Sequence, residues 1–403
     1  MPRRSPFTRV SLALATVAPL LVSSGCSTVG YYSQAIGGHL ALMRAREPIA
    51  ELLSDADTDP ALRAKLETLT EARAFAVREL ALPDNDSYSS YVATGRRAVT
   101  WNVVAAAEFS VNARTWCFPV AGCVNYRGYF DEQEARDYAA ALATTEGFDV
   151  TVGGASAYST LGWFDDPVLD TMLRGDAIRY VGTLFHELAH QVLYVQDDSD
   201  FNEAYATFVE RTGVRLWLSE RGEADRIAAY EDSLDRGEDF VALLKSTREE
   251  LQALYAEPDL DDATRRERKA EVFAGMRERY AELKVSWNDY AGYDGWFSRE
   301  LNNARLVAVS TYRRLVPAFA ALYVEAGEDI GRFHELAAEV GALEPPARRT
   351  RLDALTRSAA AASPGRTPAD VASTGVTSRA AVRSRADRET RAGEHRAVVQ
   401  GAG

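Results

Sequence analysis

The sequence predicts an α+β fold that is predominantly helical, with a small mixed sheet next to a central helix. Three observations support this prediction. Apolar residues recur at three- and four-residue steps through most of the 403 residues, as in amphipathic helices. The stretch 98–129 is instead rich in Val, Thr, Phe, Tyr and Trp in short runs, which is typical of strands. Finally, 46% hydrophobic and 26% charged residues describe a globular chain that can bury a core.

A basic, an apolar and a small-residue segment open the chain in that order. Three arginines within the first nine residues precede the apolar run 10–22, which is shorter than a membrane span. This order predicts a secretory signal peptide over residues 1–25. Its Gly-Cys end resembles a bacterial lipoprotein signal, in which Cys26 is lipidated; Ser23 departs from the preferred Leu, so cleavage without a lipid is the alternative. We therefore expect export to the periplasmic face of the envelope, with an N-terminal lipid anchor in the outer membrane.

The rest of the chain is predicted to form helices on both sides of one strand-rich stretch. Residues 35–82 predict two helices with a break at Asp59-Pro60, and strands follow within 98–129. The remaining elements expected up to residue 219 are a helix at 132–144, a strand at 148–152, and helices at 177–195 and 202–218.

The C-terminal half predicts helices and then a tail. Residues 220–285 form a charge-rich helical hairpin that breaks at Pro258, and further helices occupy 301–343. Residues 357–403 hold eight arginines against four acidic residues and almost no large apolar side chains. This composition predicts a disordered tail.

The charge of the chain argues against one class of partner, and two of its cysteines are placed to form a disulfide. The formal net charge of −13 is spread along the chain and argues against nucleic acid as a partner. Cys117 and Cys123 flank a turn with Pro119 and Gly122. In an oxidising compartment they can form a local disulfide, and two buried thiols are the alternative.

The candidate metal-binding and catalytic motif is His186-Glu187-x-x-His190, in the middle of the helical pattern 177–195. Two histidines four residues apart lie on one helix face, where both imidazoles can bind one Zn²⁺. Glu187 lies about 100° further round the helix. It therefore flanks the metal and can act as the general base for water. Two core histidines on a buried helix are the alternative reading.

A catalytic zinc needs a third protein ligand, and no further histidine follows nearby. Glu203, in the first turn of the next predicted helix, is best placed. Glu210 lies two turns further on and could support a ligand, and the aspartates at 197, 198 and 200 are further alternatives.

These segments resemble the thermolysin-like gluzincin metallopeptidases. Asn202-Glu203-Ala204-Tyr205-Ala206 is similar to the Asn-Glu-Gly-Phe-Ala segment that supplies a glutamate ligand in zinc aminopeptidases. More specifically, residues 20–345 look like a family of proteobacterial lipoproteins classed as aminopeptidases. The matching segments are Gly25-Cys26, Gly30-Tyr31-Tyr32-x-Gln34-Ala35-x-Gly37, 117–123, 126–130, 158–162 and 301–305. One departure is that only twelve residues separate His190 from Glu203, against about eighteen or more in the broader gluzincins.

The resemblance implies a zincin-like fold, a zinc cofactor and a peptide substrate. One metallopeptidase domain would then span 26–356, with a helical part at 26–97, the sheet and zinc helices at 98–219, and a helical part at 220–356. Gluzincins bind substrate along an edge strand upstream of the metal helix, where this chain has Gly153, Gly154 and Tyr158. Four tyrosines are candidates for stabilising an oxyanion: Tyr158, Tyr205, Tyr290 and Tyr293.

Three functions remain open at this point. The first is a zinc aminopeptidase. The second is a zinc endopeptidase of the same fold, and the third is a non-catalytic envelope lipoprotein that binds partners. An intact Glu187 argues against the third, because a structural zinc has no use for a general base.

Overall fold

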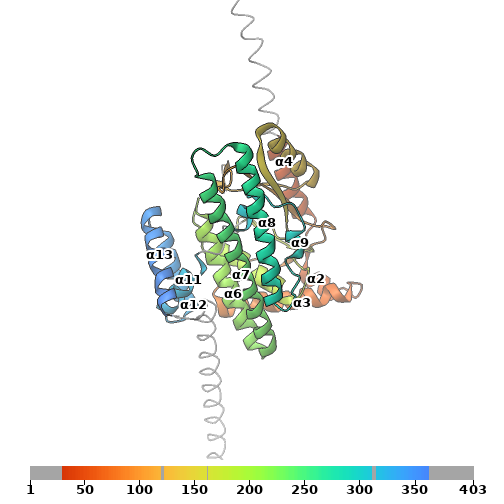
Figure 1. Cartoon of the computed structure of the whole chain (residues 1–403). Coiled ribbons are helices and arrows are strands. Elements are labelled where there is room, and N and C mark those ends of the chain that lie inside the picture. Colours follow the sequence, from red (N-terminus) through yellow and green to blue (C-terminus); the bar gives the residue numbers. More distant parts are fainter. Residues whose placement is uncertain (1–29, 119–121, 161, 311–314, 363–403) are drawn as a thin grey trace, which may run out of the picture.

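The computed structural model describes residues 30–118, 122–160, 162–310 and 315–362 (Figure 1). The predicted signal peptide, Cys26 and most of the predicted tail lie outside these residues. The described part is predominantly helical with small sheets, so the α+β prediction is confirmed. No described helix is both long enough and apolar enough to cross a membrane.

The N-terminal part has three helices and a short strand between residues 30 and 80, where we expected two helices in 35–82. Residues 30–44 form a helix, and α2 (Ile49–Ser54) and α3 (Pro60–Leu80) follow. The predicted break at Asp59-Pro60 is the start of α3, because Asp59 Oδ1 accepts a hydrogen bond from Leu62 N over 2.9 Å. Helix α3 buries Leu66, Leu69 and Phe75 against the metal-motif helix, α5 (Ala177–Val192).

The described strands form two three-stranded sheets and one two-stranded hairpin. One is mixed: β2 (Ser90–Val92) pairs antiparallel with β1 (Glu47–Pro48) and parallel with β8 (Val168–Leu169). The other is antiparallel, with the order β6-β3-β7. Its strands are β3 (Thr100–Ala107), β6 (Arg127–Tyr129) and β7 (Phe148–Ala155). A separate hairpin joins β4 (Trp116–Phe118) to β5 (Gly122–Val124).

Helices cover both faces of the antiparallel sheet. Helix α4 (Glu132–Glu146) packs with β3 and β7 around Val103 and Ala105, whereas α10 (Asn303–Ser310) packs on the opposite side chains, Val104 and Ala106. The predicted strand 148–152 continues to Ala155. The two glycines that we expected to follow the strand therefore lie within it, paired with Asn102 and Trp101.

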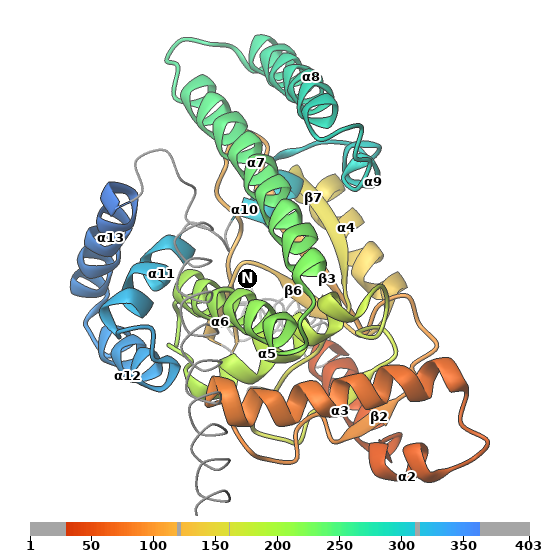
Figure 2. The same ribbon diagram turned by 90° about the horizontal axis from the view of Figure 1, so that it is seen from below.

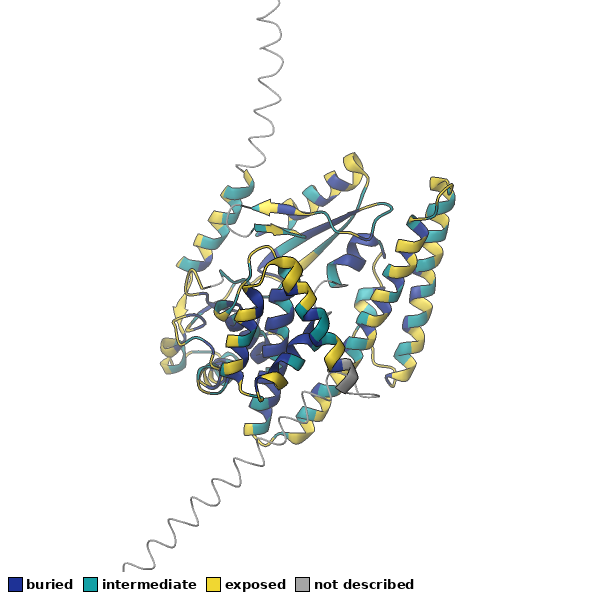
Figure 3. Ribbon diagram, turned by 90° about the vertical axis from the view of Figure 1, so that its left-hand side faces the viewer, coloured by how far each residue is buried: buried dark blue, intermediate teal, exposed yellow. Residues whose placement is uncertain are grey.

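The main core lies between α5 and α6 (Ser199–Glu220), and Figure 3 shows buried residues concentrated on the helices in the middle of the molecule. Helices α11 (Val316–Glu325), α12 (Ile330–Gly341) and α13 (Pro345–Ala362) close one side of it. The tail boundary at residue 357 is wrong, because α13 continues to Ala362. Leu355, 1% exposed, anchors that last stretch to the core.

The predicted helical hairpin is present as α7 (Ala224–Tyr255) and α8 (Asp262–Ser286), which project together from the α5–α6 layer (Figure 2). Their apolar faces form a second core with α9 (Asp294–Phe297) and α10. Tyr293 stacks on Phe240 in this second core, with ring centroids 4.3 Å apart.

Candidate metal centre

Helix α5 presents the two motif histidines in one direction. Its N-cap is Asp176, whose side chain accepts a hydrogen bond from Arg179 N. His186 and His190 lie one turn apart, and their Nε2 atoms approach to 3.2 Å. The helix ends at Val192, three residues before the predicted end, because the backbone of Leu193 is extended.

A short connection, residues 193–198, turns the chain from α5 into α6. Asn202, 1% exposed, holds this connection with two hydrogen bonds to one residue: Val195 N donates to Oδ1, and Nδ2 donates to Val195 O, both over 2.7 Å. Asp198 caps α6 by accepting from Phe201 N. These two hydrogen bonds, the Asn202–Val195 clamp, hold the turn tight, which explains how Glu203 can reach the histidines after so few residues.

The carboxylate of Glu203 lies against both imidazoles. Its Oε2 is 3.3 Å from His186 Nε2, and its Oε1 is 3.7 Å from His190 Nε2. One ligand atom from each of the three residues falls within 4.8 Å of the others. The structure therefore brings His186, His190 and Glu203 into one triad.

Glu210 lies behind the triad. Its Oε2 is 3.1 Å from His186 Nδ1, the ring nitrogen that faces away from Glu203. Gly182, one turn before His186 on α5, leaves room for this carboxylate. A Cβ at residue 182 would lie 3.2 Å from Glu210 Oε1 and 3.4 Å from its Cγ. Glu210 therefore orients His186 so that Nε2 points into the triad.

Glu187 is half-buried and lies near three other carboxylates. Burial raises its pKa, and the carboxylates of Glu203, Asp166 and Glu210 add to this effect against the opposing charge of His186, to a pKa of about 7. Burial opposes protonation of His186, yet its hydrogen bonds with Glu203 and Glu210 raise its pKa well above the ordinary value.

Asp166, a residue that sequence reasoning missed, is fully buried near Glu187. Thr160 donates to its carboxylate through N over 2.7 Å and through Oγ1 over 2.9 Å. Its carbonyl oxygen accepts from Tyr88 N. Asp166 thereby fixes the aromatic segment that precedes α5, and burial raises the pKa of its own carboxyl group.

Two tyrosines at the triad were also missed. Desolvation and the charge of Glu203 raise the pKa of Tyr126 to about 12, and burial followed by the charge of Glu203 also raises the pKa of Tyr194. Both hydroxyls therefore stay protonated at neutral pH and can donate hydrogen bonds. Tyr126 directly precedes β6, and no local pattern links it to a motif 60 residues later.

The tyrosines considered from the sequence have other surroundings. Tyr205 is fully buried, and its hydroxyl lies 2.7 Å from His334 Nδ1. Tyr290 and Tyr293 neighbour each other at the α7–α8 hairpin. Tyr158 packs against Phe130, with ring centroids 5.3 Å apart.

The β4–β5 hairpin contacts the connection between α5 and α6. A disulfide joins Cys117 to Cys123, which face each other across the two strands. Asp197, in the α5–α6 connection, accepts a hydrogen bond from Cys123 N over 2.9 Å. A Cβ at Gly122 would lie 2.3 Å from the same Asp197 oxygen, so this contact requires a glycine there.

The donor set of the triad suits zinc. Two imidazole nitrogens and one carboxylate oxygen are the ligands of catalytic zinc sites that keep one position open. His186 Nδ1, which does not face the triad, contacts the Glu210 carboxylate, as in many such sites. The residues present thus fit a zinc ion, with Glu187 beside it.

The sequence model of a protein family described as "Putative aminopeptidase" matches residues 30–352. The chain belongs to this family. The match includes the triad, Glu187 and Glu210, and family membership suggests a peptidase. No curated protein and no solved structure gives a significant match. For this aminopeptidase family member, the zinc ion and the relation to gluzincins stay predictions.

Proposed function

We propose that this protein is a zinc-dependent aminopeptidase in which His186, His190 and Glu203 hold the metal and Glu187 is the general base. The observation that carries the proposal is the triad, with both Nε2 atoms directed at the Glu203 carboxylate. A structural zinc site would not need a further, half-buried carboxylate at its edge. Glu187 provides one.

Different residues would have different roles in amide hydrolysis. Bound zinc would supply Lewis acidity and lower the pKa of water at the site towards about 7. Glu187, which lies beside the triad without belonging to it, accepts a proton from the attacking water and donates it to the leaving amine. Glu210 keeps His186 in its ligating orientation.

We assign Tyr126 to the developing oxyanion. Its hydroxyl keeps its proton at neutral pH and lies within the electrostatic reach of Glu203 and Glu187. A hydroxyl that donates more strongly as negative charge forms on the carbonyl oxygen lowers the barrier to attack. Tyr194 is the alternative donor; its ring centroid lies 6.4 Å from that of His190.

Zinc content and peptide hydrolysis test the proposal together. The purified protein should hold about one zinc per chain by elemental analysis and cleave peptides with a free α-amine faster than the same peptides after N-acetylation. Chelation should abolish turnover, and added zinc should restore it. A protein that hydrolyses both peptides equally is an endopeptidase, and one that binds zinc without hydrolysing either overturns the peptidase proposal.

We further propose that the protein is exported and lipid-anchored through Cys26. The disulfide between Cys117 and Cys123 supports an oxidising compartment. Mass spectrometry of the mature N-terminus should find a diacylglyceryl-modified Cys26, and Cys26→Ala should release the protein from membranes into the soluble fraction. An unmodified Cys26 in mature, membrane-bound protein would refute the anchor.

A further inference from the structure

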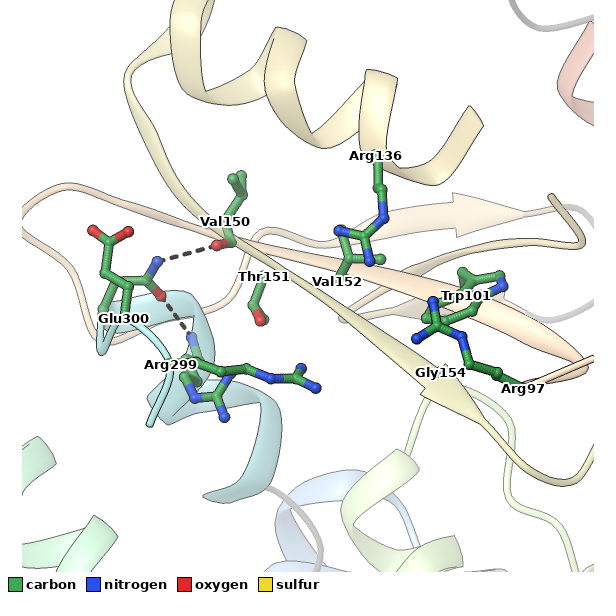
Figure 4. A pocket seen from close by; sticks show the side chains of 11 residues that line it. Arg97, Trp101, Arg136, Val150, Thr151, Val152, Gly154, Arg299 and Glu300 are labelled. Atoms are coloured by element: carbon green, nitrogen blue, oxygen red, sulfur yellow. Dashed lines mark hydrogen bonds between the residues drawn. The ribbon is translucent and has the colours of Figure 1, made fainter. Parts of the chain in front are cut away.

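Four arginines line a cleft of about 480 Å³ beside strand β7 (Figure 4). Arg97 and Arg136 lie on the α4 side, next to Trp101, and Arg299 lies in the segment between α9 and α10. The fourth, Arg305, comes from α10. The chain as a whole carries a net charge of −13, so its composition does not account for this concentration of cations. The volume suits a small-molecule site, which typically measures about 300–1,000 Å³.

Arg305 is a buried cation with an unused hydrogen-bond donor. It is 8% exposed, and its Nη2 donates to Trp296 O over 2.7 Å. Its guanidinium carbon lies 4.7 Å from the centroid of the Trp296 ring, so the group is held from two sides. Its Nε is buried and has no hydrogen-bond partner among the described residues. Such a group costs free energy unless something compensates for the water that it has lost.

The charges that act on Arg305 are those of other cations. Burial lowers the pKa of Arg305, and the charges of Arg299 and Arg277 lower it further. Arg277, on α8, donates from Nη2 to Arg299 O over 2.9 Å, so these two side chains begin next to each other. Within the described chain, none of the three forms an ion pair with a carboxylate. A buried charge without a counter-charge is costly, so an anion in the cleft would stabilise it.

The carboxylates near the cleft do not neutralise it. Arg97 and Arg136 share one carboxylate, that of Glu132. Glu300 belongs to the lining, and Figure 4 shows its carboxylate pointing away from Arg299. The cleft therefore presents a positive potential to a ligand, strongest where the arginines have no acidic partner.

The edge of β7 is occupied where Arg305 enters the cleft. Asn302 donates from Nδ2 to Val150 O over 3.0 Å, and its Oδ1 accepts from Arg305 N over 2.9 Å at the start of α10. One side chain thus covers a backbone carbonyl of the strand and fixes Arg305 beside it. A ligand at this end of the cleft meets side-chain cations, not unpaired backbone groups of the strand.

We propose that this cleft binds the phosphate group of an organic phosphate ester, with Arg299 and Arg305 on the phosphate oxygens and the organic part of the ligand towards Trp101. Guanidinium groups bind phosphate oxygens through paired N–H donors. A phosphate ester carries a charge of about −1.5 to −2 at neutral pH, which matches two unpaired arginines better than one carboxylate does. The cleft is larger than a bare phosphate, which leaves room for the rest of an ester. The proposal goes beyond peptidase activity, because the ligand is not a peptide and its binding requires neither the triad nor Glu187.

Isothermal titration calorimetry of the full-length protein with glucose 6-phosphate tests this proposal. The ester should bind in a salt-dependent manner, and glucose should not bind. Succinate, with two carboxylates, should bind about ten-fold more weakly, and equal binding overturns the assignment to phosphate. Because a phosphate can also bind to zinc, the titration is repeated on chelator-treated Glu203→Gln protein. Unchanged affinity there supports the cleft, whereas lost affinity places the phosphate at the metal and overturns the proposal.

A competition experiment distinguishes a soluble ester from a lipid headgroup that carries the same phosphate. Vesicles of phosphatidylcholine with phosphatidic acid should displace glucose 6-phosphate if the cleft accepts a phosphate at a lipid surface, and vesicles of phosphatidylcholine alone should not. If neither kind of vesicle displaces the sugar phosphate, the ligand is a soluble ester. Both results keep the phosphate site. A native protein that binds neither glucose 6-phosphate nor the phosphatidic acid vesicles in preference to phosphatidylcholine overturns it.

A matched pair of charge reversals locates the site. Arg299→Glu, at an exposed residue of the cleft, should weaken binding of glucose 6-phosphate about ten-fold or more, whereas Arg349→Glu, on the remote helix α13, should leave it unchanged. Arg305→Lys keeps the charge and removes the planar fork, so it should also weaken binding. Circular dichroism and thermal unfolding confirm that the variants fold. Native affinity in a folded Arg299→Glu protein overturns the proposal.

Discussion

Replacing Asn202 should damage both the stability of the fold and the metal centre, because this one side chain shapes the turn that delivers Glu203. Asn202 is buried and makes two hydrogen bonds of 2.7 Å to Val195. A net hydrogen bond contributes about 1 kcal/mol, and a buried group left without a partner costs about 1–3 kcal/mol. We therefore expect Asn202→Ala to lower the free energy of unfolding by about 2–4 kcal/mol.

Urea denaturation of the zinc-free protein measures this loss, since bound metal would otherwise add to stability. Zinc titration of the folded variant should show a weaker site, because the relaxed turn no longer holds the Glu203 carboxylate against His186 and His190. Glu203→Gln separates the two effects: it removes a metal ligand and should weaken zinc binding, while the two hydrogen bonds between Asn202 and Val195 that shape the turn remain.

Asn303→Ala is the matched control. Asn303 is also fully buried, and its Nδ2 donates to Glu108 O over 2.8 Å and to Ala107 O over 3.2 Å, on the β3 side of the molecule. It should lose a similar amount of stability and keep native zinc affinity. Native zinc affinity in a folded Asn202→Ala protein, or a loss of stability below about 0.5 kcal/mol, would refute the clamp.

Three further predictions follow from the site and the core. Glu187→Gln should keep bound zinc and lose about 100-fold or more in kcat, whereas Glu203→Gln should lose zinc affinity, with activity partly restored by excess zinc; a native rate for Glu187→Gln contradicts the mechanism. Gly182→Ala should crowd Glu210, whose Oε1 would lie 3.2 Å from the new Cβ, and weaken zinc binding a few-fold, measured by competition with a chelator; unchanged affinity would contradict the role given to Gly182. Burial lowers the pKa of His334, so the unfolded chain binds a proton on this side chain at a higher pH than the folded protein does. The stability that the neutral side chain contributes is therefore present above about pH 6.5 and is lost as the pH falls below that value. In zinc-free protein, this decrease in the free energy of unfolding should be smaller for His334→Gln, and equal pH dependences would contradict the assignment.

Local spacing determined the parts of the site that lie within one helix. His186 and His190 face the same way because residues four apart share a helix face, whatever surrounds the helix. The capping aspartates before α3 and α5 act within their own first turns. The tail boundary failed for a related reason: the alanine-rich stretch after residue 357 continues a helix whose anchor, Leu355, precedes it.

Tertiary structure decided everything that joins separate segments. Glu203 was a prediction with alternatives until the clamp by Asn202 placed its carboxylate beside both imidazoles. Tyr126 and Asp166 reach the same centre from segments with no spacing relation to the motif.

The cleft along the outer edge of β7 has the same origin (Figure 4). The arginines that line it come from segments as distant in the sequence as Arg97 and Arg305, and the packing of the chain around one sheet brings them together. Helical spacing relates residues that are close together in the chain, so it can be predicted from the sequence alone. A buried charge or a strand edge acquires its partners only from the packing of distant elements, because burial and electrostatic contact depend on position in space.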